Sequence, residues 1–188
     1  KYELKANETF TTPLVFCGYS SQGFGEMSRQ MNRFAINHVL PRQFNDKILP
    51  VLYNSWEATE FDVNTKDQTK LAKLAAAMGV ELFVMDDGWF GSRRHDKAGL
   101  GDWTVSPEVF PNGLAPVIDY VHDAGMKFLL WFEPERVKAG TPITLEHPEF
   151  FIFPENEKNT NLLLNLGDEN AWNYCFNTLA GMIEQIGV

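Results

Sequence analysis

The stretch Glu81-Leu82-Phe83-Val84-Met85-Asp86-Asp87-Gly88-Trp89 decides the fold class of this chain. It is a short continuous apolar run, and two adjacent carboxylates stand where the run ends. A run of this length without alternating polar residues predicts a strand of a parallel sheet that is covered on both faces. Asp86 and Asp87 then lie at the carboxyl end of that strand, where the chain turns away from the sheet.

The same pattern stands on either side of this stretch. Residues 48–53 form an apolar run that is followed by Asn54-Ser55-Trp56-Glu57. Residues 127–132 form another run, which is followed by Glu133-Pro134-Glu135. We therefore expect three strands, each of which ends in acidic or aromatic side chains.

Amphipathic segments between these runs predict helices. Thr65 and Gln68 suit a capping box at the start of the first helix, and a third helix is expected from about Asp168 to Ile186. Gly79 and Gly125 are stop signals after the first two helices. Apolar residues at positions i, i+3, i+4 and i+7 predict the two buried faces, which are Leu71, Leu74, Ala75 and Met78, and then Leu114, Val117, Ile118 and Val121.

Strands that alternate with helices predict a parallel sheet, either open and doubly wound or closed into a barrel. An open sheet concentrates its chemistry at one crevice, whereas a barrel gathers all its strand ends around one cavity. Here all three strands end in chemically useful residues, and no Gly-rich phosphate loop follows the first one. The sequence therefore predicts an α/β fold, a partial (β/α)8 TIM barrel. Only the first three β/α units are expected, because a full barrel needs about 250 residues.

The first 45 residues differ from the remainder. Residues 11–20 are rich in β-branched and aromatic types, which favour strands, and glycines then break the pattern. We expect residues 1–45 to be the end of an N-terminal β-rich domain with a connector. Residues 46–188 are expected to be the N-terminal part of the barrel, cut before its fourth strand. Both ends are interpreted as cuts, because the chain starts at Lys1 and ends one residue after Gly187, the stop signal of the last predicted helix.

The charge balance argues against nucleic acid as a partner. Twenty-five acidic against 16 basic side chains give a net charge of -9, and no basic patch emerges that could neutralise phosphates. The apolar runs are far shorter than the roughly 20 residues that cross a bilayer, so no membrane association is expected. Cys17 and Cys175 lie far apart in the sequence and are expected to be buried free thiols.

The paired aspartates leave two interpretations open. Asp86 and Asp87 beside Trp89 could accept hydrogen bonds from neighbouring hydroxyls while an indole covers the apolar face of a sugar, which suits a neutral polyol. Alternatively, one aspartate caps the following segment or pairs with Arg93 or Arg94. The sequence favours neither interpretation over the other.

Two tryptophans and two glutamates stand at the other strand ends. A single tryptophan usually belongs to a core, but Trp56 and Trp131 recur at the same level, as aromatic platforms for sugars would. Glu133 and Glu135 suggest general acid/base chemistry, because paired carboxylates carry out glycoside hydrolysis. Their alternative roles are orientation of neighbours by Glu133 and a local ion pair between Glu135 and Arg136.

Other chemistries have little support in the sequence. His95, His122 and His147 lack the spacing of a metal site, so no metal is expected. No Gly-x-Ser-x-Gly elbow is present, which argues against ester-type nucleophilic hydrolases. A metal-dependent barrel hydrolase that uses Asp86 with a distant histidine is kept as the weakest hypothesis.

Six segments in one fixed order, considered together, resemble the α-galactosidases of glycoside hydrolase family 36. The resemblance covers essentially the whole chain, and no single motif carries it alone. The segments are QGFGEMS (22–28), PVLYNSWEA (50–58), MDDGWFGSR (85–93), LGDW (100–103), FPNGL (110–114) and LWFEPERV (130–137).

This resemblance implies a β-sandwich domain that ends near residue 40, followed by the catalytic barrel. It implies a retaining exo-acting hydrolase of terminal α-D-galactosyl residues that uses two aspartates, both after Val188. No catalytic residue is then expected within this chain, which should be inactive as it stands. The implied substrate-binding residues are Trp56 and Trp131, which wall the site, and Asp86 and Asp87, which bind the galactose 4- and 6-hydroxyls.

The resemblance also implies the partner, an α-galactoside oligosaccharide or glycoconjugate, with no cofactor. We expect a cytoplasmic location, and a homo-oligomer of the full-length protein is left open. Many family members carry an arginine where Asn159 and Thr160 stand here. An α-N-acetylgalactosaminidase is therefore an alternative, as is a non-catalytic sugar-binding protein on the same scaffold.

Overall fold

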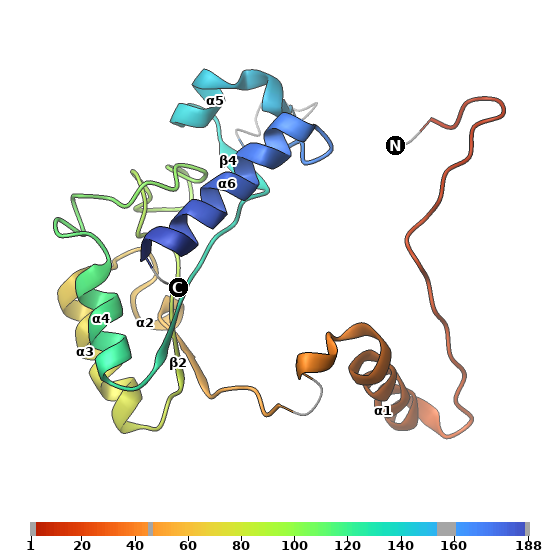
Figure 1. Ribbon diagram of the computed structural model, residues 1–188, viewed down its shortest axis with the longest axis horizontal. Helices are drawn as coiled ribbons and strands as arrows, with labels where there is room; N and C mark the ends of the chain where they lie inside the picture. The colour runs from red at the N-terminus through yellow and green to blue at the C-terminus, as the bar shows by residue number, and fades with distance from the viewer. Residues whose placement is uncertain (1–2, 45–46, 154–160, 187–188) are drawn as a thin grey trace. The chain divides into compact units, whose positions relative to one another are not determined.

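The computed structural model describes residues 3–44, 47–153 and 161–186 of the chain. Two compact units are distinguished, Lys1–Leu49 and Pro50–Val188 (Figure 1).

The first unit is helical where it has regular structure. Helix α1 (Gly23–Phe34) continues as the π-helical turn η1 (Ala35–Val39), and a short 3-10 turn, η2 (Arg42–Phe44), follows. Residues 11–20 form no strand within the described part of this unit. Their β-branched composition favours a strand only where a partner strand supplies hydrogen bonds, so the β-rich domain stays a prediction.

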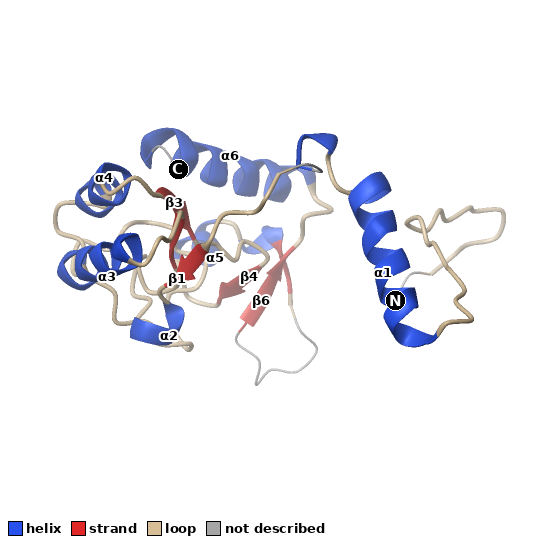
Figure 2. Cartoon of the chain, turned by 90° about the horizontal axis from the view of Figure 1, so that it is seen from below, coloured by secondary structure: helices blue, strands red, loops and turns tan. Residues whose placement is uncertain are grey.

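Three parallel strands form the centre of the second unit. They are β1 (Leu52–Asn54), β2 (Leu82–Met85) and β3 (Lys127–Leu130), and they lie in the order β1-β2-β3. Figure 2 labels β1 and β3 of this sheet. Each predicted apolar run contains one of them. Parallel neighbours that are consecutive in the chain are joined by helical crossovers, which confirms the predicted α/β class.

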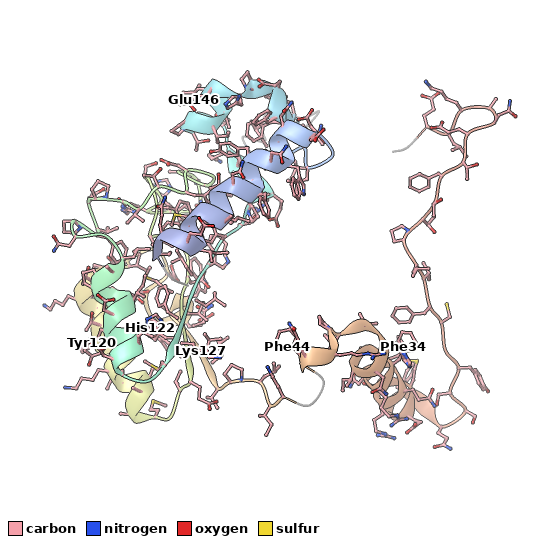
Figure 3. All side chains as sticks on the ribbon, viewed as in Figure 1. Phe34, Phe44, Tyr120, His122, Lys127 and Glu146 are labelled. Atoms are coloured by element: carbon pink, nitrogen blue, oxygen red, sulfur yellow. The ribbon has the colours of Figure 1, made fainter. Side chains whose placement is uncertain are left out.

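Helices α3 (Thr65–Ala77) and α4 (Ala115–Asp123) make two of these crossovers and lie side by side (Figures 1 and 2). The core between them and the sheet is apolar and includes Phe83 and Phe128 from the strands. On α4, Val117, Ile118 and Val121 are buried, which confirms the predicted face. Figure 3 labels Tyr120 and His122 on this helix, together with Lys127 at the start of β3, and Tyr120 packs partly buried against the core.

The buried face of α3 matches the predicted one in part. Of the predicted residues, Ala75 is buried and Leu71 packs partly buried against the core, whereas the exposed fractions of Leu74 and Met78 are 54% and 83%. Ala72, which was not predicted, is fully buried, and its small side chain allows close approach to the neighbouring elements. The apolar spacing of residues 71–78 therefore predicted the helix and half of its buried face.

The start of α3 also differs from the predicted capping box. The N-cap is Asn64, whose Oδ1 accepts a hydrogen bond from the backbone N–H of Asp67 at 2.9 Å. Its Nδ2 donates to the Asp67 carboxylate at 2.8 Å. Gln68 cannot reach back to Thr65 as a capping box requires, because its side chain is fully buried and donates to Thr59.

A small antiparallel sheet follows β3, in a segment for which no strands were predicted. Its strands lie in the order β4-β6-β5 and pack with helix α5 and the 3-10 turn η3 over a second apolar core. The bounds are β4 (Arg136–Lys138), α5 (Pro142–Glu146), η3 (Pro148–Phe150), β5 (Phe151–Ile152) and β6 (Asn161–Leu164).

Helix α6 (Glu169–Ile186) spans both cores of the second unit. Its residues Met182 and Ile186 pack against the first core, and Tyr174 and Cys175 pack against the second. Cys175 is half-buried, and this burial raises the pKa of its thiol. The expectation of two buried thiols is wrong for Cys17, which is exposed.

The orientation of α3 predicts how two substitutions differ. Ala72→Leu adds volume at a position with no exposed surface, so it should destabilise the fold by about 1–3 kcal/mol. Leu74→Ala removes a largely exposed side chain and should change the free energy of unfolding by less than about 0.5 kcal/mol. Urea titrations of both variants check this, and the reverse ranking would contradict the observed orientation.

Tyr53 on β1 gives a prediction for alkaline pH. Its hydroxyl is buried without a hydrogen-bond partner among the described residues, and burial raises the pKa of Tyr53 above the ordinary value of 10.0. The stability linked to this group is therefore fully present below pH 10 and is lost as the pH rises toward the raised pKa.

Tyr53→Phe should accordingly be neutral or stabilising at pH 7, by up to about 1 kcal/mol, because it removes an unsatisfied buried hydroxyl. It should also flatten the loss of stability above pH 10. Thermal unfolding at pH 7 and pH 10.5 measures both effects, and a clear destabilisation at pH 7 would show that the hydroxyl has a partner.

Candidate functional site

The carboxyl ends of the three parallel strands lie at one level. In the strand register, Asn54 pairs with Val84, and Met85 pairs with Leu130. One or two residues beyond these pairs, the chain reaches the tryptophans and aspartates that the sequence singled out.

Hydrogen bonds continue past the strands and tie their tips together. The backbone N–H of Ser55 donates to the Val84 carbonyl, and that of Trp131 donates to the Met85 carbonyl, both at 3.0 Å. The Asp86 N–H donates to the Ser55 hydroxyl at 3.0 Å, and Ser55 is fully buried. The three tips are thereby held as one rigid rim.

An open hollow of about 510 Å³ lies at these tips. All four predicted binding residues, Trp56, Asp86, Asp87 and Trp131, line it. The remaining lining residues are Asn54, Glu57, Phe61, Arg93, Asp96, Glu133 and Arg136. The hollow therefore receives side chains from the segments after β1, β2 and β3 together.

Asp86 is held by uncharged groups. Its Oδ2 accepts a hydrogen bond from the Asn54 amide at 2.6 Å, and its Oδ1 accepts one from the Asp87 N–H at 2.8 Å. The Asn54 Oδ1 in turn accepts the Trp56 N–H at 2.8 Å. Asn54 therefore orients the Asp86 carboxylate and fixes the start of the short helix α2 (Trp56–Thr59), which carries the first indole.

Asp87 is buried and ion-paired. Its carboxylate accepts hydrogen bonds from the Arg93 guanidinium at 2.8–3.1 Å and from the Gly88 N–H at 2.7 Å. The cap and the ion pair that the sequence offered as alternatives are thus both present. Asp87 also lines the hollow. Its contacts with Arg93 and Gly88 are compatible with the binding of a sugar hydroxyl, which stays a prediction.

The turn after the aspartates depends on glycine. Gly88 has φ +97°, and a Cβ at this position would lie 2.5 Å from the Phe61 carbonyl oxygen. Only glycine combines a left-handed backbone with this close approach. The segment after β2 is thereby pressed against the segment after α2, and both line the hollow.

Trp131 rests on an aromatic cluster. Its ring stacks on Phe90 at 6.4 Å and meets Trp103 edge-on at 6.3 Å. The Trp89 indole N–H donates to the Trp131 carbonyl at 3.0 Å. On the opposite side of the site, Trp56 packs edge-to-face on Phe61 at 5.0 Å. Both indoles are half-buried, so each combines core packing with a surface on the hollow.

The carboxylates after β3 have a local role. Arg136 forms an ion pair with Glu133, with an Nη2–Oε2 distance of 2.7 Å. The predicted pair of Arg136 with Glu135 is wrong, because the turn between β3 and β4 brings Glu133 to the guanidinium instead. Orientation of neighbours by Glu133, one of its two predicted roles, fits this contact.

Several lining residues were not predicted. Asn54 could have been found from its position, since it ends a strand, and Arg93 was predicted only as a possible ion-pair partner of the aspartates. Phe61 gave no signal, because an isolated phenylalanine between two helices is indistinguishable from a core residue. Asp96 lies in a polar loop that the sequence did not connect with the strand ends.

The described residues offer neither a cluster of metal ligands nor a membrane-spanning helix. Within residues 3–44, 47–153 and 161–186, no three His, Cys, Asp or Glu side chains are grouped so that they could hold a metal ion. In the same part of the chain, no helix is both long enough and apolar enough to cross a membrane.

Parallel strands whose tips enclose a hollow of carboxylates and indoles define an α/β protein of the (β/α)8-barrel class, here a part of the barrel. The Melibiase family model matches residues 9–188. The chain therefore belongs to this family, and its relatives are α-galactosidases of glycoside hydrolase family 36, as the sequence motifs implied.

Two curated relatives show the extent of the similarity. α-Galactosidase Mel36A of Lactobacillus acidophilus is 38% identical over 188 residues, which cover 98% of this chain and 26% of the relative. α-Galactosidase AgaA of Geobacillus stearothermophilus is 36% identical over 184 residues, which cover 96% of this chain and 25% of the relative. This chain thus spans about a quarter of the length of the curated relatives that it matches.

Solved structures agree with these relatives. The α-galactosidase from Lactobacillus brevis matches with a TM-score of 0.82 at 36% identity, over 90% of this chain and 23% of that one. A variant of AgaA in complex with 1-deoxygalactonojirimycin matches with a TM-score of 0.81 at 34% identity, over 89% and 24%. Other AgaA variants were solved in complex with stachyose and with raffinose.

One point of the sequence comparison lies outside the described residues. Asn159 and Thr160, which replace the arginine of many family members, fall in the segment 154–160. The following residues Asn161–Leu164 form β6, which pairs with β4 and β5.

The turn at Gly88 predicts a difference between two glycines. Gly88→Ala and Gly113→Ala both place an alanine at positive φ, but a Cβ at Gly113 would have open space around it. Gly113→Ala should cost about 1 kcal/mol, and Gly88→Ala at least about 2 kcal/mol more. Thermal or urea unfolding measures both, and equal costs would show that Phe61 does not approach the turn so closely.

Proposed function

We propose that this chain is the sugar-binding part of the barrel of a retaining, exo-acting α-galactosidase. The observation that carries the proposal is the convergence of Trp56, Asp86, Asp87 and Trp131 on one hollow. Family membership supports the same activity, since the curated relatives are α-galactosidases. The substrate class proposed is a terminal α-D-galactosyl residue on an oligosaccharide or glycoconjugate.

The hollow suits a neutral sugar by its chemistry. Carboxylates accept hydrogen bonds from hydroxyls, and such bonds to charged acceptors are stronger than neutral ones. Indole faces cover the apolar C–H surface of a pyranose ring and exclude water from it. Asp86 is the more accessible of the two aspartates, because Asp87 is 4% exposed and Asp86 only partly buried.

The proposed reaction is a double displacement. In it, one carboxylate attacks the anomeric carbon and a second carboxyl group protonates the leaving oxygen, the two groups being about 5–5.5 Å apart. Water then hydrolyses the glycosyl-enzyme intermediate, with the second group acting as base. The resemblance to the family implies that both groups lie after Val188, and we propose that the part of this chain is to bind and orient the galactosyl ring.

Binding at Asp86 and Asp87 contributes to rate if it strengthens as the ring distorts. Hydrogen bonds that tighten in the transition state raise kcat, whereas equal binding in both states lowers only KM. The rigid rim of strand tips favours the first case, because donors and acceptors held in advance need no reorganisation during the reaction.

The activity is tested on the product of the complete gene, with p-nitrophenyl α-D-galactopyranoside as substrate. We expect hydrolysis with retention at the anomeric carbon. Binding of galactose without hydrolysis would favour a non-catalytic sugar-binding protein. Faster hydrolysis of the corresponding N-acetylgalactosaminide would favour the alternative specificity.

Asp86→Asn tests the role of Asp86 in this reaction, because it keeps the size of the side chain and removes its charge. It should lower kcat/KM by about 2–4 kcal/mol of transition-state binding. Asp119→Asn, on the exposed side of α4, is the control and should leave kcat/KM unchanged. If the two variants behave alike, Asp86 does not contact the substrate.

A further inference from the structure

The two neighbouring aspartates of the hollow are supported in different ways. Among the described residues, Asp86 is held only by uncharged donors, the Asn54 amide and a backbone N–H. Asp87 is held by a guanidinium, and both partners of this ion pair are buried, with side-chain exposures of 5% for Asp87 and 6% for Arg93. A buried ion pair is costly to desolvate unless its geometry is excellent.

The geometry of this ion pair is close to ideal. The Arg93 Nη2 lies 2.8 Å from Oδ2 of Asp87, and the Nε lies 3.0 Å from Oδ1 and 3.1 Å from Oδ2. This is the two-pronged arrangement in which a planar guanidinium fixes both oxygens of a carboxylate. Rotation of the Asp87 carboxylate would break it.

Arg93 is itself fixed from three further directions. Its Nη1 donates to the carbonyls of His95 and Ala98 at 3.3 and 3.1 Å. Its guanidinium carbon lies 5.0 Å from the centre of the Phe61 ring, a cation–π contact. Every nitrogen of the guanidinium therefore has a partner, and four of its five N–H groups are used by Asp87 and the two carbonyls.

Asp87 retains capacity to accept a further hydrogen bond. A carboxylate offers about four lone-pair directions, and among the described residues three N–H groups reach this one: the Gly88 N–H, one N–H of Arg93 Nη2, and the single Nε–H, which the two oxygens share. One acceptor direction of the carboxylate is thus open to a hydroxyl group in the hollow, which Asp87 lines.

We propose that Arg93 is a positioning residue for substrate binding. It holds the Asp87 carboxylate in one orientation, with the unused acceptor site available to a galactosyl hydroxyl, and it acts only through Asp87. This inference rests on the proposed function, since it needs a sugar in the hollow.

A double-mutant cycle in the complete gene product tests it. Arg93→Lys keeps the positive charge but cannot form the two-pronged contact, so it should lower kcat/KM by roughly 10- to 100-fold. In an Asp87→Asn background, the same substitution should lower kcat/KM by less than about threefold, because the group that Arg93 positions is already lost.

Arg94→Lys is the matched control. Arg94 is the next residue along the chain and donates to the carbonyls of Gly88 and Arg93 and to the Ser106 hydroxyl, but not to a carboxylate of the hollow. Its effect on kcat/KM should be small and the same in both backgrounds. Circular dichroism spectra of all the variants verify that each one is folded before its kcat/KM is compared.

The outcomes separate the two proposals. An inactive wild-type protein would overturn the proposed function and this inference with it. If the wild type is active and Arg93→Lys costs equally in both backgrounds, Arg93 only supports the loop through His95 and Ala98, and the inference is wrong. Should Arg93→Lys not fold, a crystal structure of the wild type with galactose decides, since Asp87 must accept hydrogen bonds from Arg93 and a sugar hydroxyl together.

Discussion

The site depends on the pairing of β1, β2 and β3 in register up to their carboxyl ends. Backbone hydrogen bonds from Ser55 and Trp131 extend this pairing past the last strand residues. The Ser55 hydroxyl accepts the N–H of Asp86 and closes the rim between β1 and β2. Because the rim is continuous, side chains from three distant segments of the chain reach one hollow with fixed geometry.

Charge is distributed unevenly around this rim. Asp87 is compensated by buried Arg93 and Glu133 by Arg136, whereas Asp86 is held by an amide. The compensated carboxylates are fixed by strong contacts, and Asp86 stays the more accessible acceptor. Aromatic packing fixes the two indoles in a similar way. Phe61 packs against the Trp56 ring, and the aromatic cluster that includes Phe90 packs against the Trp131 ring. A rigid polar and aromatic surface of this kind is suited to a ring with hydroxyl groups.

Local sequence patterns predicted the features that depend on neighbouring residues in the chain. Continuous apolar runs gave the three strands, and carboxylates directly after them gave the site. The face of α3 was predicted only in part, because spacing alone cannot tell whether a helix packs through Leu74 or through Ala72. The sheet β4-β6-β5 was missed, since its strands are short and pair residues far apart in the chain. The partner of Arg136 was missed for another reason: Glu133 lies only three residues away, but the turn after β3 decides whether Glu133 or Glu135 reaches the guanidinium.

Hydrogen–deuterium exchange with and without galactose, on the complete gene product, tests the convergence of the strand tips most directly. The account predicts that galactose slows exchange together in residues 54–57, 86–94 and 131–136, while residues 115–123 of α4 are unaffected. Slower exchange in only one of the three segments, or in none while the sugar is bound, would contradict it.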